Sequence, residues 1–225
     1  MKIKKVFKIT QNSRHDFISK VIDSSSPSVE FYFLVTMSTL IVTFGLASNN
    51  VILVIGGMLV TPLLFPILAI SLGVVTSERK LLLRSIKVFL FSIILALIIA
   101  FIVGFLTKVY VYRIDLITLM KPSWFSFVVA VTAGIAASYS WAKPNLDNIL
   151  PGTAITVTLI PPLTALGLVL GEQSWFLFFR VLEFFVLNVF GIIVGSLLVF
   201  LLMDFYKAKT QASKEIKLEA KKLAK

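Results

Sequence analysis

The chain has 225 residues, of which 58% are hydrophobic and 15% are charged, and its mean hydropathy is +0.96. Soluble domains are about 45–50% apolar and about 25% charged, so this composition excludes a water-soluble fold and indicates an integral membrane protein. The sequence contains no cysteine, which excludes a disulfide framework and a thiolate metal site, and its net charge is +11.

Residues 1–28 form a basic leader that includes the sole histidine, His15. The first apolar run begins after this leader and is long enough to cross a membrane. We therefore expect a retained anchor and not a cleavable signal peptide. With one histidine and no cysteine, we expect neither a metal site nor a cofactor.

Six apolar stretches follow the leader, each close to the roughly 20 residues that a membrane-spanning helix requires. Because lipid offers no partner to open backbone groups, all six are predicted to be helices. The fold class is therefore an all-α polytopic membrane protein. The stretches cover residues 29–47, 51–75, 88–107, 123–142, 149–170 and 184–203.

Three marks in the first half of the chain recur 96 residues later with the same spacing: Gly56, Pro66 and Arg84 recur as Gly152, Pro162 and Arg180. We predict two three-helix repeats, residues 29–112 and 123–203, followed by a basic cytoplasmic tail helix, residues 204–225. Three spans in the first repeat reverse the orientation of the second. The repeats are therefore predicted to be inverted, a symmetry that suits alternating access.

The distribution of positive charge predicts the orientation. With six full crossings, 18 of the 22 Lys and Arg residues fall on the side that holds both termini. The positive-inside rule then predicts cytoplasmic termini in a multi-pass protein of the inner (cytoplasmic) membrane. If the second and fifth segments were re-entrant hairpins, 16 would fall on that side, and a parallel repeat would favour a channel.

Prolines are predicted to break the second and fifth helices near mid-membrane. Each proline removes an amide donor and clashes with the carbonyl one turn back. An unwound turn is tolerated in a membrane only where it faces protein, water or a bound solute. The alternative is a pair of kinks that only shape packing. The candidate substrate- or ion-binding residues are Thr61, Pro62, Pro66, Thr156, Thr158, Pro161 and Pro162, with Asn188 facing the bundle interior.

Two other groups of polar residues flank the spans. Polar turns precede the second and fifth segments, and their side chains are candidates for helix caps or gates: Asn49, Asn50, Asn145, Asp147 and Asn148. Charges near the starts of the third and sixth segments are predicted at the membrane edge, as snorkelling side chains or a local ion pair: Arg84, Arg180 and Glu183.

Surface features predict the partners. Gly191 and Gly195 form a small-residue helix face, which indicates close packing inside one protomer or in a homo-oligomer. The basic leader and tail are expected to lie on anionic cytoplasmic lipid. The net charge reflects the positive-inside bias, so the expected partners are the bilayer and an unknown small solute or ion, and not nucleic acid.

The motifs around the prolines carry a resemblance. Residues 55–68 (IGGMLVTPLLFPIL), followed by Thr76–Glu78 and by Arg84-Ser85, resemble the signature of the prokaryotic membrane family catalogued as domain of unknown function 389. Residues 150–163 resemble its second motif, and the resemblance covers roughly residues 29–203. Many relatives carry a soluble N-terminal domain, whereas only a short leader is expected here. The resemblance implies the architecture and no substrate.

The favoured function is a secondary transporter or channel for a small solute or ion, with its site between the two broken helices. The alternative is a non-transporting membrane scaffold or regulatory subunit. A transporter should have a polar, water-accessible cavity between the breaks, whereas a scaffold should pack them dry. We expect no enzyme and no catalytic residue, because the spans supply neither a histidine nor an acid pair, and Glu183 alone cannot perform such chemistry.

Overall fold

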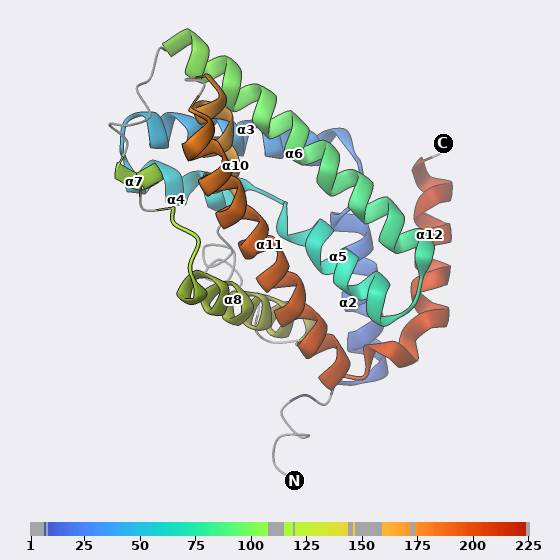
Figure 1. Ribbon diagram of the computed structural model, residues 1–225. Coiled ribbons are helices and arrows are strands. Elements are labelled where there is room, and N and C mark those ends of the chain that lie inside the picture. The colour runs from blue at the N-terminus through green and yellow to red at the C-terminus, as the bar shows by residue number, and fades with distance from the viewer. Residues whose placement is uncertain are drawn as a thin grey trace.

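The computed structural model describes residues 7, 9–107, 115–118, 120–143, 146, 159–171 and 174–223, and every regular element within these ranges is helical. The all-α fold class is confirmed (Figure 1). In chain order the elements are α2 (Gln11–Ser24), α3 (Val29–Ala47), α4 (Val51–Val60), α5 (Leu64–Val75), α6 (Arg79–Thr107), α7 (Asp115–Thr118), α8 (Trp124–Ala142), α10 (Ile160–Gly171), α11 (Trp175–Leu202), the 3-10 helix η3 (Phe205–Ala208) and α12 (Lys209–Leu223).

Four of these helices, α3, α6, α8 and α11, are long and apolar enough to cross a membrane. A fifth candidate span consists of α4 and α5, which meet at a bend of 50°. These helices support an integral membrane protein with four or five candidate spans. The predicted span 149–170 is represented only by α10, because residues 149–158 lie outside the described part of the chain. The count of six spans stays a prediction.

Two long helices extend beyond the apolar runs that predicted them. α6 begins at Arg79 and α11 at Trp175, whereas the predicted spans begin at residues 88 and 184. Hydropathy locates only the part of a helix that lipid favours. The helical backbone hydrogen bonds continue into the preceding charged residues, because a charged side chain does not interrupt a helix.

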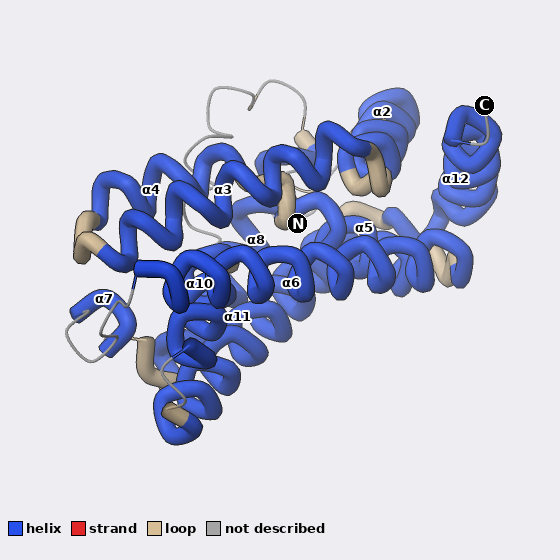
Figure 2. The backbone as a smooth tube through the Cα atoms, turned by 90° about the horizontal axis from the view of Figure 1, so that it is seen from above, coloured by secondary structure: helices blue, strands red, loops and turns tan. Residues whose placement is uncertain are grey.

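α3 and α4 form a tight hairpin, and α3 lies against α6 and α10 (Figure 2). Asn49 takes a left-handed conformation, with φ 53°, in the turn between the two helices. The Asn50 side chain caps α4 by accepting hydrogen bonds from the amides of Ile52 and Leu53. Ser38 of α3 donates to the carbonyl of Gly57 at 2.9 Å, which ties the two helices together inside the apolar interior.

α5 and α10 are short helices that are buried on every side. Residues 66–73 of α5 and residues 160–169 of α10 are all buried. α5 packs against α6, α11 and α2, and α10 packs against α6, α11 and α3. Both helices are apolar around their whole circumference, which is the pattern of a helix enclosed by others.

The two ends of the described chain pack together. Phe17 of α2 contacts the rings of Phe200 and Phe205 at centroid distances of 5.5 and 5.3 Å. Ile216 of α12 is buried, and α12 packs against α2 and α6. The apolar faces of α2 and α12 thus pack against protein, and contact of the basic leader and tail with anionic lipid stays a prediction for their remaining faces.

The small-residue face of α11 is used within the chain. Gly191 and Gly195 lie against α8, and Gly134 of α8 lies against α11. A Cβ atom at Gly191 would be 3.2 Å from the Phe127 carbonyl oxygen, and one at Gly195 would be 2.9 Å from the Ile135 amide nitrogen. In this chain the small-residue face therefore mediates close packing within one protomer, against α8, and a homo-oligomer stays a prediction.

Replacing both Gly191 and Gly195 with Leu should therefore force α8 away from α11. Overpacking of a dense interior costs about 1–3 kcal/mol, so we expect the thermal midpoint of the purified protein in detergent to fall by several degrees. Gly56→Ala is the matched control, because a Cβ atom at Gly56 meets nothing within 4 Å. A midpoint as high in the double variant as in Gly56→Ala would contradict this packing.

Candidate functional site

The break between α4 and α5 lies at Thr61 and Pro62. α4 ends at Val60, and Thr61 continues in an extended conformation with φ −73° and ψ 132°. Pro62 lacks an amide proton and cannot extend the helical hydrogen-bond ladder. α5 then begins at Leu64, in a direction that differs by 50° from that of α4.

The other prolines of the candidate site begin helices and do not interrupt them. Pro66 lies in the first turn of α5, and Pro161 and Pro162 lie in the first turn of α10. First-turn amides have no carbonyl partner within the helix, so a proline at these positions costs no hydrogen bond. In the first half, the interruption is therefore at Pro62 and not at Pro66. In the second half, the residues just before α10 are not described, and a break there stays a prediction.

The hydroxyl groups beside the two helix starts differ in their bonding. Thr61 Oγ1 is buried and has no hydrogen-bond partner among the described residues. Thr164 Oγ1 donates to the carbonyls of Ile160 and Pro161 at 3.1 and 3.0 Å. Thr164 was not among the predicted residues, although a threonine one turn after a proline pair is well placed to reach such carbonyls.

Five predicted residues lie outside the described part of the chain: Asn145, Asp147, Asn148, Thr156 and Thr158. The second half of the predicted site, including its polar turn, is therefore not placed. The first half is represented by Thr61, Pro62 and Pro66, by the Asn50 cap of α4 and by Asn49, whose side chain donates to Asp115.

Several polar side chains lie in the apolar interior without a partner among the described residues. Asn188 of α11 is 4% exposed, and its Nδ2 atom donates no hydrogen bond to the described part of the chain. The hydroxyls of Ser85, Ser138 and Ser196, on α6, α8 and α11, are in the same condition. A buried polar group without a partner costs about 1–3 kcal/mol. The sequence predicted only Asn188, because burial of the serines depends on helix packing.

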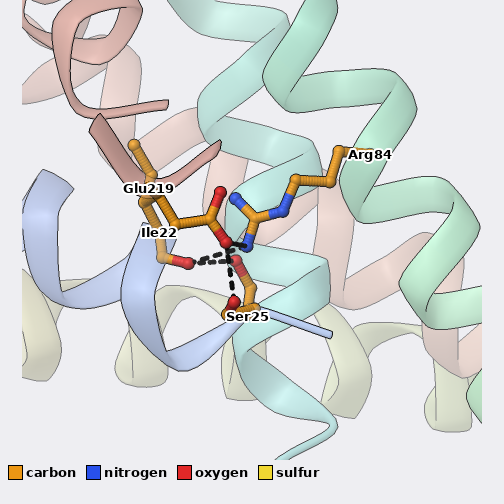
Figure 3. Close-up of polar contacts among 5 residues, drawn as sticks. Ile22, Ser25, Arg84 and Glu219 are labelled. Carbon is orange, nitrogen blue, oxygen red and sulfur yellow. Dashed lines mark hydrogen bonds and ion pairs between the residues drawn. The ribbon is translucent and has the colours of Figure 1, made fainter. Parts of the chain in front are cut away.

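A polar cluster joins α2, α6 and α12 (Figure 3). Arg84 Nη2 lies 3.0 Å from Glu219 Oε1, and the two side chains are 16% and 5% exposed. The same Nη2 atom donates to the carbonyl of Ile22 at 2.9 Å, and the Ser26 hydroxyl donates to Glu219 at 2.6 Å. Ser25 donates to the Ile22 carbonyl as well. We call these five residues the Arg84 cluster.

Arg180 occupies the corresponding position in the second half, but its surroundings differ. Its Nη2 atom lies 3.5 Å from the carbonyl oxygen of Ile117, in α7. Near the same end of the molecule, the Asn49 amide donates to Asp115 at 3.0 Å. Glu183 lines an outer groove between α8 and α11 and forms no ion pair with Arg180. Among the described residues, only Arg84 has a buried carboxylate partner, and sequence reasoning did not identify Glu219.

Comparison with known proteins identifies a family. The model of the family described as Domain of unknown function (DUF389) matches residues 58–194. An uncharacterized protein of Methanocaldococcus jannaschii is 29% identical over 191 residues, which cover 83% of this chain and 58% of that protein. The chain thus spans less than two thirds of the length of this curated relative. No solved structure matches the chain.

Glu219→Ala should strongly destabilise the protein, because it leaves the buried Arg84 guanidinium without its ion-pair partner. Breaking a buried pair costs about 3–5 kcal/mol. Lys207→Ala is the control, since the Lys207–Asp204 pair is exposed, with side chains 56% and 48% accessible. The thermal unfolding midpoints of the two variants, measured in detergent, report both losses of stability. The double variant Arg84→Met/Glu219→Leu should recover part of the loss, and equal effects of Glu219→Ala and Lys207→Ala would refute a buried pair.

Proposed function

This chain belongs to the DUF389 family, and we propose that it is a secondary transporter or channel for a small solute or ion. In this proposal two inverted three-helix repeats frame a path through the protein. The path passes the interior starts of α5 and α10, beside Thr61 and Asn188. The observation that carries the proposal is that the helix bounds of the first half recur in the second half, and that the corresponding long helices run in opposite directions.

The helix bounds support two copies of one unit. α5 and α10 each have 12 residues, and their first residues, Leu64 and Ile160, are 96 positions apart. α6 and α11, with 29 and 28 residues, begin 96 positions apart at Arg79 and Trp175. α3 and α8 both have 19 residues and begin 95 positions apart. The 96-residue spacing between the recurring Gly, Pro and Arg residues thus also separates the corresponding helices, to within one residue.

Contacts at the helix ends support the inversion. The beginning of α6 lies beside α2, where Arg84 bonds to Ile22, whereas the end of α11 lies beside α2, where Arg14 bonds to the Met203 carbonyl at 3.1 Å. Gly171, at the end of α10, lies near Phe105, toward the end of α6, whereas α5 ends just before α6 begins. α6 and α11 therefore run in opposite directions across the molecule (Figure 1). Inverted repeats with central, interrupted helices are the architecture of many secondary transporters.

The interior polar groups support a path and not only a packed core. α5 begins inside the protein without a side-chain cap, and Leu63 before it is fully buried. Amides at such a start carry partial positive charge. Thr61, Asn188 and Ser196 add polar atoms that lack partners among the described residues. Water, an ion or a polar solute would bind to these groups, whereas in a dry core each would lack a hydrogen bond and destabilise the fold.

We also propose that the end formed by α2 and α12 faces the cytoplasm, in the inner membrane. Lys20 and Lys143 lie at this end, with Arg79 and Lys80 at the start of α6. A concentration of Lys and Arg at one end supports this orientation through the positive-inside rule.

The second candidate is a non-transporting membrane scaffold or regulatory subunit. It is favoured by the apolar packing of α5 and α10, in which Ile67, Leu68 and Leu163 are fully buried. The two candidates differ in one measurable property, which is the access of water to the start of α5.

Cysteine labelling measures that access, because the chain has no native cysteine. A path predicts that Thr61→Cys and Asn188→Cys react with a small, membrane-impermeant thiol reagent in proteoliposomes, since only a hydrated thiol ionises and reacts readily. Ala69→Cys, in the dry part of α5, should stay unlabelled, and Asn50→Cys at the exposed cap should label fully. If Thr61→Cys and Asn188→Cys are as inert as Ala69→Cys, the scaffold is correct and the transporter is not.

Flux through proteoliposomes tests transport itself. With gradients of K⁺, Na⁺, Cl⁻ and small neutral solutes as probes, we expect at least one to move faster than in protein-free vesicles. Asn188→Leu should reduce that flux about tenfold or more by removing a polar partner worth about 1–3 kcal/mol. Ser92→Ala is the matched control at the corresponding repeat position, because the Ser92 hydroxyl already donates to its own helix at Val88. Equal flux in both variants would remove Asn188 from the path.

A further inference from the structure

A groove on the outer surface combines positive charge with apolar walls. It has a volume of about 590 Å³ and lies between α3 and the first half of α6. Lys80, Arg84 and Lys87 line it, together with apolar side chains that continue along α6 to Phe91. The apolar run of this span begins at residue 88, which predicts that the groove lies at the level where lipid headgroups give way to hydrocarbon.

The two lysines are the charges available to a ligand. Arg84 is balanced by Glu219 in the Arg84 cluster and by the nearby charge of Asp23. Lys80 and Lys87 are seven residues apart on α6, on the same helical face as Arg84, and form no ion pair with the described residues. No acidic side chain lines this groove within the described chain. The groove therefore presents an uncompensated positive charge to an anion.

The rest of the groove suits a hydrocarbon chain. Leu83 and Phe91 are 47% and 55% exposed, and Val88 lies between them along α6. Tyr32 of α3 packs edge-to-face against Phe91 with ring centroids 5.1 Å apart. Tyrosine is typical of the membrane–water boundary, where its ring is apolar and its hydroxyl meets water. One wall thus suits an anionic group, and the wall that continues along α6 suits an acyl chain.

The second half of the chain contains a groove of similar construction and opposite charge. It has a volume of about 460 Å³ and lies between α8 and α11. Ser123, Glu183 and Leu187 line it at positions 96 residues after Pro27, Lys87 and Phe91 of the first groove. The Glu183 carboxylate therefore occupies the position of the Lys87 amine, so the two grooves have corresponding lining positions but opposite charge.

We propose that the groove between α3 and α6 is a binding site for an anionic phospholipid of the surrounding bilayer. The phosphate lies between Lys80 and Lys87, and an acyl chain lies along Leu83, Val88 and Phe91. Basic pockets beside membrane helices bind anionic headgroups in this manner. The groove around Glu183 does not bind such a lipid, because its carboxylate repels phosphate. This site does not depend on whether the protein transports a solute.

Native mass spectrometry and lipid-dependent thermal unfolding test the site on the full chain, purified in detergent, with phosphatidylglycerol and phosphatidylcholine as probes. Wild type should retain phosphatidylglycerol in preference to phosphatidylcholine and gain thermal stability from it. Lys80→Gln/Lys87→Gln should bind phosphatidylglycerol about 30-fold more weakly, at about 1 kcal/mol per lysine. Without lipid its unfolding midpoint should equal that of wild type.

Arg79→Gln/Lys209→Gln is the matched control, since it removes the same charge from exposed positions outside the groove. It should retain phosphatidylglycerol as wild type does. Equal weakening in the two double variants, or no preference over phosphatidylcholine, would overturn the proposal. So would displacement of the lipid by inorganic phosphate, because that result assigns the groove to the free anion.

Discussion

A helix that is buried on every side must be enclosed by other helices, and this condition governs α5 and α10. Each is only 12 residues long and cannot form a continuous wall against lipid. The long helices α6 and α11 flank both, while α3 covers α10 and α2 covers α5. Since lipid would not satisfy the open backbone at the starts of these helices, the surrounding protein must exclude it. The close approach of α8 to α11 at Gly191 and Gly195 contributes to this enclosure.

Hydropathy predicts the long spans well, because the bilayer imposes one composition and one length on each of them. It does not locate the starts of α6 and α11, where helical hydrogen bonds continue into charged sequence. The prediction that prolines break the second and fifth helices overstates the effect of Pro66, Pro161 and Pro162, which lie in first turns. A proline breaks a helix only where a carbonyl one turn back would otherwise accept a hydrogen bond from that position. First-turn positions have no such carbonyl within the helix. The sequence alone does not reveal which turn of a helix a proline occupies.

Part of the candidate site is also predictable from the sequence. Thr61 and Asn188 stand out as polar residues in apolar runs, and both have buried polar atoms in the structure. Ser85 and Ser138 look equally suited to bond within their own helices, as Ser92 does, so that only the fold distinguishes them. Glu219 was not predictable as the partner of Arg84, because it lies on a polar helix whose docking depends on α2.

The Arg84 cluster has a consequence for biosynthesis. Ser26 and Glu219 are separated by 193 residues, so a ribosome must complete almost the whole described chain before their hydrogen bond can form. During that interval Arg84 enters the membrane region without its carboxylate, while α2 has no α12 to cover it. Contacts between such distant residues form late in folding. Docking of α12 onto α2 and α6 therefore waits for synthesis of Glu219, and until then Arg84 lacks its ion-pair partner.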